Sequence, residues 1–309
     1  MQELVEVAKA ILKHNLNAQA DEHILIVTDS ESYEIATIFD QAGKALDNET
    51  ILMKMTTRSK SGEEPPKPVA IAMKSAEVVL CITHHSLTHT KARKEASAAG
   101  ARVATMPGIT MDMLQEGAIT ADYSEVEKLT DYYCGLLDAG EQVSIEKDNM
   151  KLTFSIKGRE GIPSTGVFRN KGESGNLPSG ESYIAPIEDS ANGSIVIDGS
   201  IAGIGVLQEP ITLTLKEGRL VKASGQDGKR LLELLGEDKG RVIAEFGIGT
   251  NKSARLTGNV LEDEKVFGTV HIAFGSNKPF GGTNEAGVHI DCVIKDPVVT
   301  LDGQPLTIK

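Results

Sequence analysis

The sequence predicts an α/β plus mainly-β protein: an N-terminal doubly wound parallel sheet followed by a β-rich domain. Up to about residue 108, nearly continuous apolar runs alternate with segments of helical spacing, which is typical of a parallel sheet covered on both faces. After residue 140 glycine becomes frequent and short strand-like runs follow one another between turns. A chain of 309 residues is also long enough for two domains of roughly 150 residues each.

Helical spacing opens the chain. Leu4, Val5, Ala8, Ile11 and Leu12 recur as one helix face between charged residues, so we expect an amphipathic helix and no signal peptide. The elements expected next are strands 23–29, 49–55, 77–84 and 101–106, and helices 32–47, 67–76, 88–100 and 124–137.

The second half contains short strands separated by turns. The expected strands are 142–146, 151–158, 193–201, 211–225 and 242–249, and the expected helix is 227–237. We therefore predict a Rossmann-like α/β domain over residues 1–140 and a β-rich domain over residues 141–309. The sequence has no internal repeat, P-loop or GxGxxG, so no motif supports nucleotide binding by the first domain.

Charge and cysteine content exclude several classes of protein. The net charge of −12 argues against a nucleic-acid partner, because such proteins present an excess of Lys and Arg. No apolar run approaches the ~18 residues that a membrane span needs. Cys81, Cys134 and Cys292 show no CxxC spacing, which favours a reducing cytoplasm. We expect a small molecule, a cation or a second copy of the chain as partner.

Two histidines and an aspartate form a candidate metal site near the C-terminus. His271 lies in the strand pattern GTVHIAFG, and His289 and Asp291 lie in VHIDCVI, where strand alternation points both side chains to one face. Imidazole and carboxylate ligands suit Zn, Co, Mn or Fe(II). From spacing alone, ordinary half-buried histidines bonded to the backbone are an equal alternative.

Two glutamates could complete such a site. Glu245 ends the apolar run RVIAE, and a carboxylate in a buried strand is costly unless it is paired or bound to a cation. Glu181 follows a Pro-Ser-Gly turn in NLPSGESYIAP. Each glutamate alone is weakly informative, because most glutamates are solvated.

Several sequence blocks in the same order resemble one enzyme family. NLPSGESYIAP, ANGSIVIDGSI, ITLTLKEGRLVKASG, AEFGIGTN, LEDEKVFGTVHIAFG and VHIDCVI together resemble the aminopeptidase T and aminopeptidase S metallopeptidases, also called leucyl aminopeptidases or the thermophilic metalloprotease family. The resemblance covers roughly residues 165–303. It implies that the β-rich domain is the metal-binding catalytic domain and that the protein is a homodimer.

The resemblance also implies a ligand set and a reaction. Two divalent ions (Zn, Co or Mn) would activate a shared water for attack on a carbonyl. The implied ligands are Glu181, Glu245, His271, His289 and Asp291.

Two further residues have implied catalytic roles. Glu264, in LEDEK, matches the family's acidic pair and is a candidate base or partner of the ligands; a solvated turn of charges is the alternative. Lys278 stands where the family carries a tyrosine that steadies the tetrahedral intermediate, so Lys278 is the candidate oxyanion partner. This substitution and the short loop between the histidines depart from the family pattern.

The main functional prediction is a metal-dependent aminopeptidase or related amide hydrolase that acts on a small molecule or short peptide. An alternative is an Fe(II)-dependent ring-cleaving dioxygenase of the dihydroxypyridine type, in which His271, His289 and Asp291 supply the facial triad. A further alternative is a non-catalytic metal-binding protein.

The α/β half has one polar cluster of its own. His84, His85 and His89 follow strand 77–84, where open parallel sheets bind ligands. Helix capping by Ser86 or Thr88 is the plainer explanation and the one we favour.

Two polar residues lie shortly before Glu181 in the sequence. Arg169 and Asn176 could hold a carboxylate or amide of the substrate.

Overall fold

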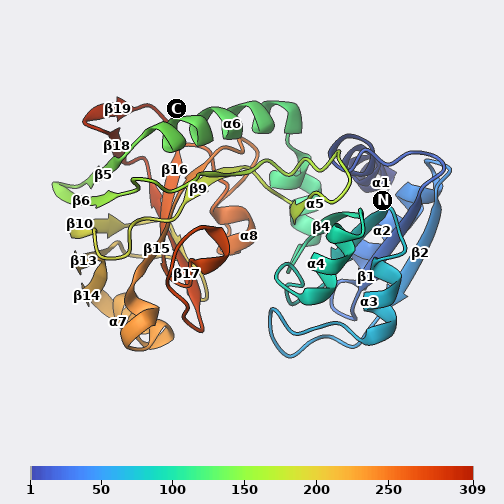
Figure 1. The fold of residues 1–309 in the computed structure, drawn as a ribbon, viewed down its shortest axis with the longest axis horizontal. Helices are drawn as coiled ribbons and strands as arrows, with labels where there is room; N and C mark the ends of the chain where they lie inside the picture. Colours follow the sequence, from blue (N-terminus) through green and yellow to red (C-terminus); the bar gives the residue numbers. More distant parts are fainter. Residues whose placement is uncertain (1, 309) are drawn as a thin grey trace. The chain divides into compact units, whose positions relative to one another are not determined.

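The computed structural model describes residues 2–308, which form two units (Figure 1). Unit 1 comprises the chain up to residue 127 and residues 166–179, and unit 2 comprises residues 128–165 and the chain from residue 180 onward. The sequence placed a single boundary at residue 140. The chain instead passes between the units after residues 127, 165 and 179.

Unit 1 is built on a five-stranded parallel sheet in the order β2-β1-β3-β4-β8. Every residue of β3 and β4 is buried, and β3 is accordingly a continuous apolar run without alternation. The strands are β1 (His23–Thr28), β2 (Glu49–Lys54), β3 (Val78–Ile82), β4 (Arg102–Thr105) and β8 (Ser174–Asn176).

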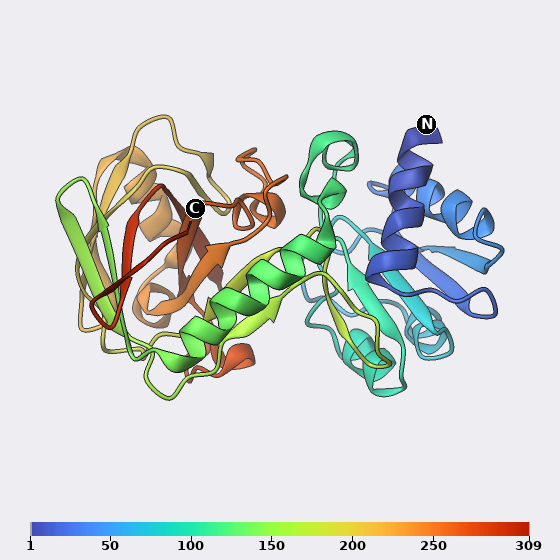
Figure 2. The same cartoon turned by 90° about the horizontal axis from the view of Figure 1, so that it is seen from above.

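Helices cover both faces of this sheet, as Figure 2 shows. One pair, α1 and α2, packs together, and α3 packs against α4. The helices are α1 (Gln2–Ala10), α2 (Tyr33–Lys44), α3 (Lys67–Met73), α4 (Lys91–Ala98) and α5 (Met111–Glu116), and a π-helical turn, η1 (Ile11–Asn15), continues α1. The predicted doubly wound fold is confirmed.

The fifth strand, β8, was not expected from the sequence. Its residues Ser174, Gly175 and Asn176 carry no apolar pattern. Side-chain hydrogen bonds hold it in place: Arg93 Nη1 donates to Ser174 Oγ over 2.9 Å, and Thr105 Oγ1 donates to Asn176 Oδ1 over 2.7 Å. Polar pairing of this kind leaves no periodicity to recognise.

Unit 2 contains two seven-stranded sheets, in the orders β14-β13-β10-β6-β5-β18-β19 and β12-β11-β17-β16-β15-β9-β7. The first has the strands β5 (Gln142–Lys147), β6 (Met150–Ser155), β10 (Asn192–Ile197), β13 (Ile211–Lys216), β14 (Arg219–Ala223), β18 (Val298–Leu301) and β19 (Gln304–Leu306). The second has β7 (Ile162–Ser164), β9 (Glu181–Ile184), β11 (Ser200–Ile201), β12 (Gly205–Val206), β15 (Ile243–Gly249), β16 (Thr269–Gly275) and β17 (His289–Lys295).

One apolar core joins the two sheets of unit 2. Phe154 of β6 and Phe246 of β15 approach with ring centroids 5.5 Å apart. Helix α6 (Tyr123–Ala139) begins in unit 1 and ends in unit 2, α7 (Gly225–Leu235) packs on β13 and β14, and α8 (Val260–Asp263) is a single turn. The β-rich second half is therefore confirmed as a pair of antiparallel sheets.

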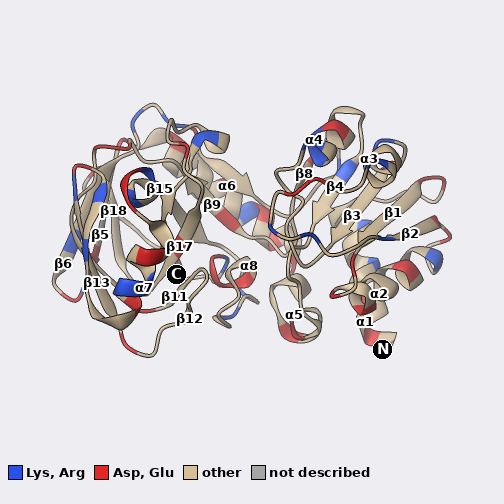
Figure 3. Ribbon diagram, turned by 90° about the horizontal axis from the view of Figure 1, so that it is seen from below, with Lys and Arg blue, Asp and Glu red and all other residues tan. Residues whose placement is uncertain are grey.

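Charged residues of both signs are interspersed along the ribbon of each unit (Figure 3). Among residues 2–308, no helix is long and apolar enough to cross a membrane.

Candidate metal centre

Four neighbouring antiparallel strands, β9, β15, β16 and β17, carry the five predicted ligands on one face of the second sheet. Phe246 and Ile272 belong to the core between the sheets. Because strand residues alternate, Glu245 and His271 point to the opposite face. The same alternation places Asp291 beside them, next to core residue Cys292. Alternate residues of each strand thus face the core, and the residues between them face the candidate site.

The ligand atoms of these residues lie close together. Nε2 of His271 is 3.2 Å from Glu245 Oε1 and 3.5 Å from Glu181 Oε2. Nε2 of His289 is 3.4 Å from Glu245 Oε2 and 3.4 Å from Asp291 Oδ1. The structure therefore brings all five predicted ligands together, and Glu245 lies between the two imidazoles.

Three overlapping groups have ligand atoms within 4.8 Å of one another. They are Glu181/Glu245/His271, Glu245/His289/Asp291 and Glu264/His271/Asp291. Among the described residues, no such group contains both histidines; Glu245 and Asp291 each link them.

Small residues directly opposite the ligands make room for this convergence. A Cβ atom on Gly247 would lie 2.1 Å from Nε2 of His271, so only glycine fits there. The strand-paired neighbours are Gly249 for Glu181, Ala273 for both Glu245 and Asp291, Gly247 for His271 and Gly275 for His289.

Unpaired buried atoms show that these residues fit a metal ion. Oε2 of Glu181 and Oδ1 of Asp291 are buried without a hydrogen-bond partner among the described residues, which costs roughly 1–3 kcal/mol each unless something binds them. Nδ1 of His289 lies 2.8 Å from the backbone oxygen of Ser276 and donates to it, which leaves Nε2 facing the carboxylates, where a bound ion would replace its proton. Metal-binding histidines are commonly oriented in this way.

Charge proximity shifts the pKa of the central groups. Burial acts to lower the pKa of His271, but its hydrogen bond with Glu245 and the carboxylate of Glu181 raise it to about 9. Burial acts to raise the pKa of Glu245, but the hydrogen bonds with His271 and His289 hold it at about 2. The metal-free site therefore pairs an ionised carboxylate with a protonated imidazole.

A buried lysine beside the ligands was not predicted. Lys265 is fully buried; its Nζ lies 2.8 Å from Glu181 Oε1 and also contacts Glu264. The alternative of a solvated turn for LEDEK is wrong, because Glu262 and Asp263 are buried too. A run of charges gives no sign of burial in the sequence, so only the fold could reveal Lys265.

Glu264 lies at the edge of this cluster with its side chain 15% exposed. Burial raises its pKa to about 8, with Lys265 opposing and Glu181 and Asp291 adding to the rise. A carboxyl group of this kind can hold or release a proton near neutral pH. Its predicted role as a base or partner of the ligands stays a prediction.

An aromatic edge adjoins the centre and was also missed. Tyr183 lies two residues after Glu181 on β9 and therefore on the same face of the sheet. Its ring centroid lies 5.4 Å from that of Phe280. Phe280 in turn lies 5.7 Å from the ring of His289, edge to face. Burial and the carboxylates of Glu245 and Glu181 raise the pKa of Tyr183 well above its usual value, so its hydroxyl stays protonated.

The predicted oxyanion partner lies in a different setting. Lys278 begins a short 3₁₀ turn (η4, Lys278–Phe280), and its Nζ pairs with Glu285 Oε2 over 2.9 Å. Both side chains of this pair are more than 60% exposed. The ion pair with Glu285 thus directs the Lys278 ammonium toward solvent. A catalytic role for Lys278 stays a prediction.

The histidine cluster of the α/β half belongs to unit 1. His84 N donates to Asp29 Oδ2 over 2.8 Å, and the rings of His84 and His85 stack edge to face. The predicted caps, Ser86 and Thr88, are not the N-cap of α4: Thr90 is, with its Oγ1 accepting from Arg93 N.

The two other polar candidates also lie in unit 1. Arg169 forms a two-pronged ion pair with Glu127, and Asn176 accepts hydrogen bonds from Thr88 and Thr105. Both side chains therefore have protein partners.

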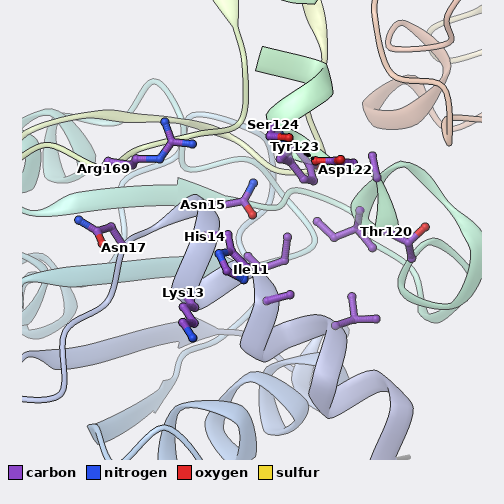
Figure 4. Close-up of a pocket in the computed structure, with 14 residues that line it drawn as sticks. Ile11, Lys13, His14, Asn15, Asn17, Thr120, Asp122, Tyr123, Ser124 and Arg169 are labelled. Atoms are coloured by element: carbon purple, nitrogen blue, oxygen red, sulfur yellow. Dashed lines mark hydrogen bonds between the residues drawn. The ribbon is translucent and has the colours of Figure 1, made fainter. Parts of the chain in front are cut away.

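A pocket of about 600 Å³ lies within unit 1, between η1 and residues 119–124 (Figure 4). Its polar lining includes His14, Asn15, Asp122 and Arg169. It contains none of the five candidate metal ligands, which all lie in unit 2.

The fold and the site define a two-unit protein with a cluster of carboxylates and histidines that could hold a metal ion. The sequence profile of the family described as "NicX: 2,5-dihydroxypyridine 5,6-dioxygenase" matches residues 3–309, so the chain belongs to this family. The solved 2,5-dihydroxypyridine dioxygenase of Pseudomonas putida KT2440 has the same fold, with a TM-score of 0.82, 16% identity and coverage of 99% of this chain and 95% of that one.

Part of the chain is also similar to aminopeptidases. Aminopeptidase AmpS of Bacillus subtilis and aminopeptidase 2 of Geobacillus stearothermophilus are each 26% identical over 150 and 148 residues, which is 41% of this chain and 36% of each relative. The matched part thus spans about a third of the length of these curated relatives. AmpT of Thermus thermophilus shares the fold with a TM-score of 0.73 at 17% identity, covering 99% of this chain and 98% of that one.

These findings correct the main functional prediction. The aminopeptidase or amide hydrolase is wrong, because the family that matches almost the whole chain is a dioxygenase family. AmpT of Thermus thermophilus shares the fold, and a shared fold does not determine the reaction. The enzyme class indicated by the family is an oxidoreductase.

Proposed function

We propose that the protein is an Fe(II)-dependent dioxygenase that cleaves the ring of a small dihydroxylated aromatic compound, with a dihydroxypyridine as the first candidate substrate. The observation that carries the proposal is the convergence of His271, His289 and Asp291 on one sheet face, in a member of the dioxygenase family. Two histidines and one carboxylate are the ligand set of non-haem Fe(II) oxygenases.

A single ferrous ion bound by this triad would supply the electron transfer to O₂ that protein side chains cannot perform. Both oxygen atoms of O₂ would end in the product across the broken ring bond. The ring carbons are then oxidised and O₂ is reduced, with no other reductant required. The chain's own residues have to bind the ring, orient it and move its protons.

The aromatic edge supports binding of a planar ring. Tyr183 and Phe280 lie on one side of the ligand cluster, and Phe280 contacts the ring of His289 edge to face. Aromatic pairs in such arrangements stabilise by about 0.5–1.5 kcal/mol beyond area burial. The protonated Tyr183 hydroxyl can donate a hydrogen bond to a substrate oxygen.

Glu264 supports proton transfer from the substrate. Its raised pKa of about 8 matches a group that takes up the proton of a ring hydroxyl near neutral pH. Its contact with Lys265 fixes the carboxyl group at the rim of the cluster. We propose Glu264 as the base for the hydroxyl that turns toward the metal.

The test is oxygen uptake by protein purified and loaded anaerobically with Fe(II). We expect stoichiometric consumption of O₂ and of 2,5-dihydroxypyridine, with loss of the aromatic absorbance. His271→Ala should abolish uptake, whereas His23→Ala should leave it unchanged, because His23 pairs with Glu77 in unit 1.

Absence of uptake with a panel of dihydroxylated pyridines and benzenes, in iron-loaded protein, would overturn the proposal. Metal content retained under those conditions would then favour a non-catalytic metal-binding protein. A homodimer, a small-molecule substrate and a cytoplasmic location remain part of the proposal; the three free buried cysteines support the last.

A further inference from the structure

The proposed ligand triad does not explain why a lysine is buried beside the candidate metal centre. Lys265 is fully buried and places one ammonium group between Glu181 and Glu264. Burying an ammonium is costly unless carboxylates compensate its charge. Here both compensating carboxylates are members of the candidate metal groups.

Lys265 contacts members of two of the three candidate metal groups. Glu181 belongs to one group and Glu264 to another, and Lys265 holds both carboxylates. Among the described residues, the ion pairs of Lys265 join it to Glu181 and Glu264 and to no member of the group Glu245/His289/Asp291. The lysine therefore competes with an ion in two groups and leaves the third open.

We propose that Lys265 occupies the place of a second metal ion, so that this centre binds one divalent ion per chain although its ligands could hold two. The ammonium is a built-in cation that neutralises Glu181 and Glu264. A single ion then binds the proposed triad of His271, His289 and Asp291, with Glu245 beside it.

Geometry and charge both support this role. Oε1 of Glu181 already accepts from Lys265 at 2.8 Å, so an ion bound to the other oxygen, Oε2, would place a second cation near the ammonium in a buried setting, where like charges repel. One divalent ion and one ammonium together carry three positive charges. The four carboxylates Glu181, Glu245, Glu264 and Asp291 carry four negative charges when all are ionised, so one ion and the ammonium stay within that number, whereas two ions and the ammonium, with five positive charges, exceed it.

The inference rests on the proposed function only in taking this centre as a metal site. Counting ions requires no substrate and no turnover. A protein that binds one ion but does not consume O₂ would contradict the proposed dioxygenase and leave the role of Lys265 intact.

The test counts Co(II) and Mn(II) per chain by elemental analysis after equilibrium dialysis at saturating metal. The wild-type protein should hold one ion, and Lys265→Ala should hold two, a twofold rise. In the Mn(II)-loaded variant, electron paramagnetic resonance should show the coupling of two neighbouring ions. Lys265→Arg keeps the charge and should stay at one ion.

Lys147→Ala is the matched control. Lys147 is another largely buried lysine of unit 2, and its Nζ pairs over 2.7 Å with Oδ2 of Asp198, which is not one of the candidate ligands. Its ion count should remain one. If Lys265→Ala does not fold, Lys265→Gln keeps a donor for Glu181 and removes the charge, and it should also take up two ions.

Two ions in the wild-type protein would overturn the inference. One ion in the folded Lys265→Ala or Lys265→Gln variant, at metal concentrations that saturate the wild type, would overturn it as well.

Discussion

At the residue scale, the candidate centre depends on large ligands facing very small neighbours. Glu245, His271 and Asp291 could be predicted because strand alternation and the family blocks both indicated them. Tyr183 and Lys265 could not. The tyrosine lies in an ordinary strand, and LEDEK has the composition of a solvated turn, so their burial depends on contacts between segments far apart in the chain.

Gly247→Ala should displace the imidazole of His271, because the new Cβ would lie 2.1 Å from Nε2. Disturbing the support of a metal ligand typically costs 10–100-fold in affinity, and we expect a loss of about that size. Calorimetric titration with Co(II) measures it. Gly135→Ala, in helix α6 with open space around its Cβ, should bind Co(II) like the wild type. Equal Co(II) affinity of the two variants would show that metal binding does not require glycine at position 247.

Metal affinity should rise with pH up to about 9. The pKa of His271 is raised from 6.5 to about 9 in the metal-free protein, so below pH 9 its proton must leave before the nitrogen can bind an ion. Each pH unit below 9 should weaken apparent affinity by up to about tenfold for this one proton. Titrations with Co(II) between pH 6.5 and 8.5 test this slope. An affinity independent of pH would show that His271 is already neutral.

At the element scale, the sequence predicted strands and helices wherever apolar spacing was strong. The buried strands β1, β3 and β4 and the helix α6 were predicted close to their observed ends. The strand β8 was missed because Ser174, Gly175 and Asn176 are held by polar contacts. The N-cap of α4 was placed two or four residues too early, since Ser86, Thr88 and Thr90 all have capping side chains and only the fold selects among them.

Thr90→Ala should destabilise unit 1 by about 1 kcal/mol, the usual cost of losing an N-cap. Its hydroxyl accepts from Arg93 N and donates to Leu87 O, and the residue is buried. Denaturant unfolding followed by hydrogen exchange in α4 measures the change. Ser75→Ala, which removes an exposed hydroxyl just beyond α3, should change stability by less than about 0.5 kcal/mol. An effect of Thr90→Ala as small as that of Ser75→Ala would contradict the capping role.

At the scale of the whole molecule, each unit has its own buried core, and the candidate ligands are confined to unit 2. The fold class was predictable because composition changes between the halves. The reaction was not: the blocks that identified the ligands occur on a fold shared by aminopeptidases and dioxygenases. The candidate ligands follow from local pattern, whereas a shared fold does not determine the reaction.

Removing the metal should therefore weaken unit 2 selectively. An ion that binds only the folded state adds about 2.7 kcal/mol of stability when it is present at 100 times its dissociation constant. Without it, the repulsion among Glu181, Glu245 and Asp291 and their unpaired oxygens oppose folding of the site. We expect chelation to speed hydrogen exchange in β9, β15, β16 and β17, while β1 and β3 of unit 1 keep their protection. Equal loss of protection in both units would mean that the ion stabilises the molecule as one cooperative body.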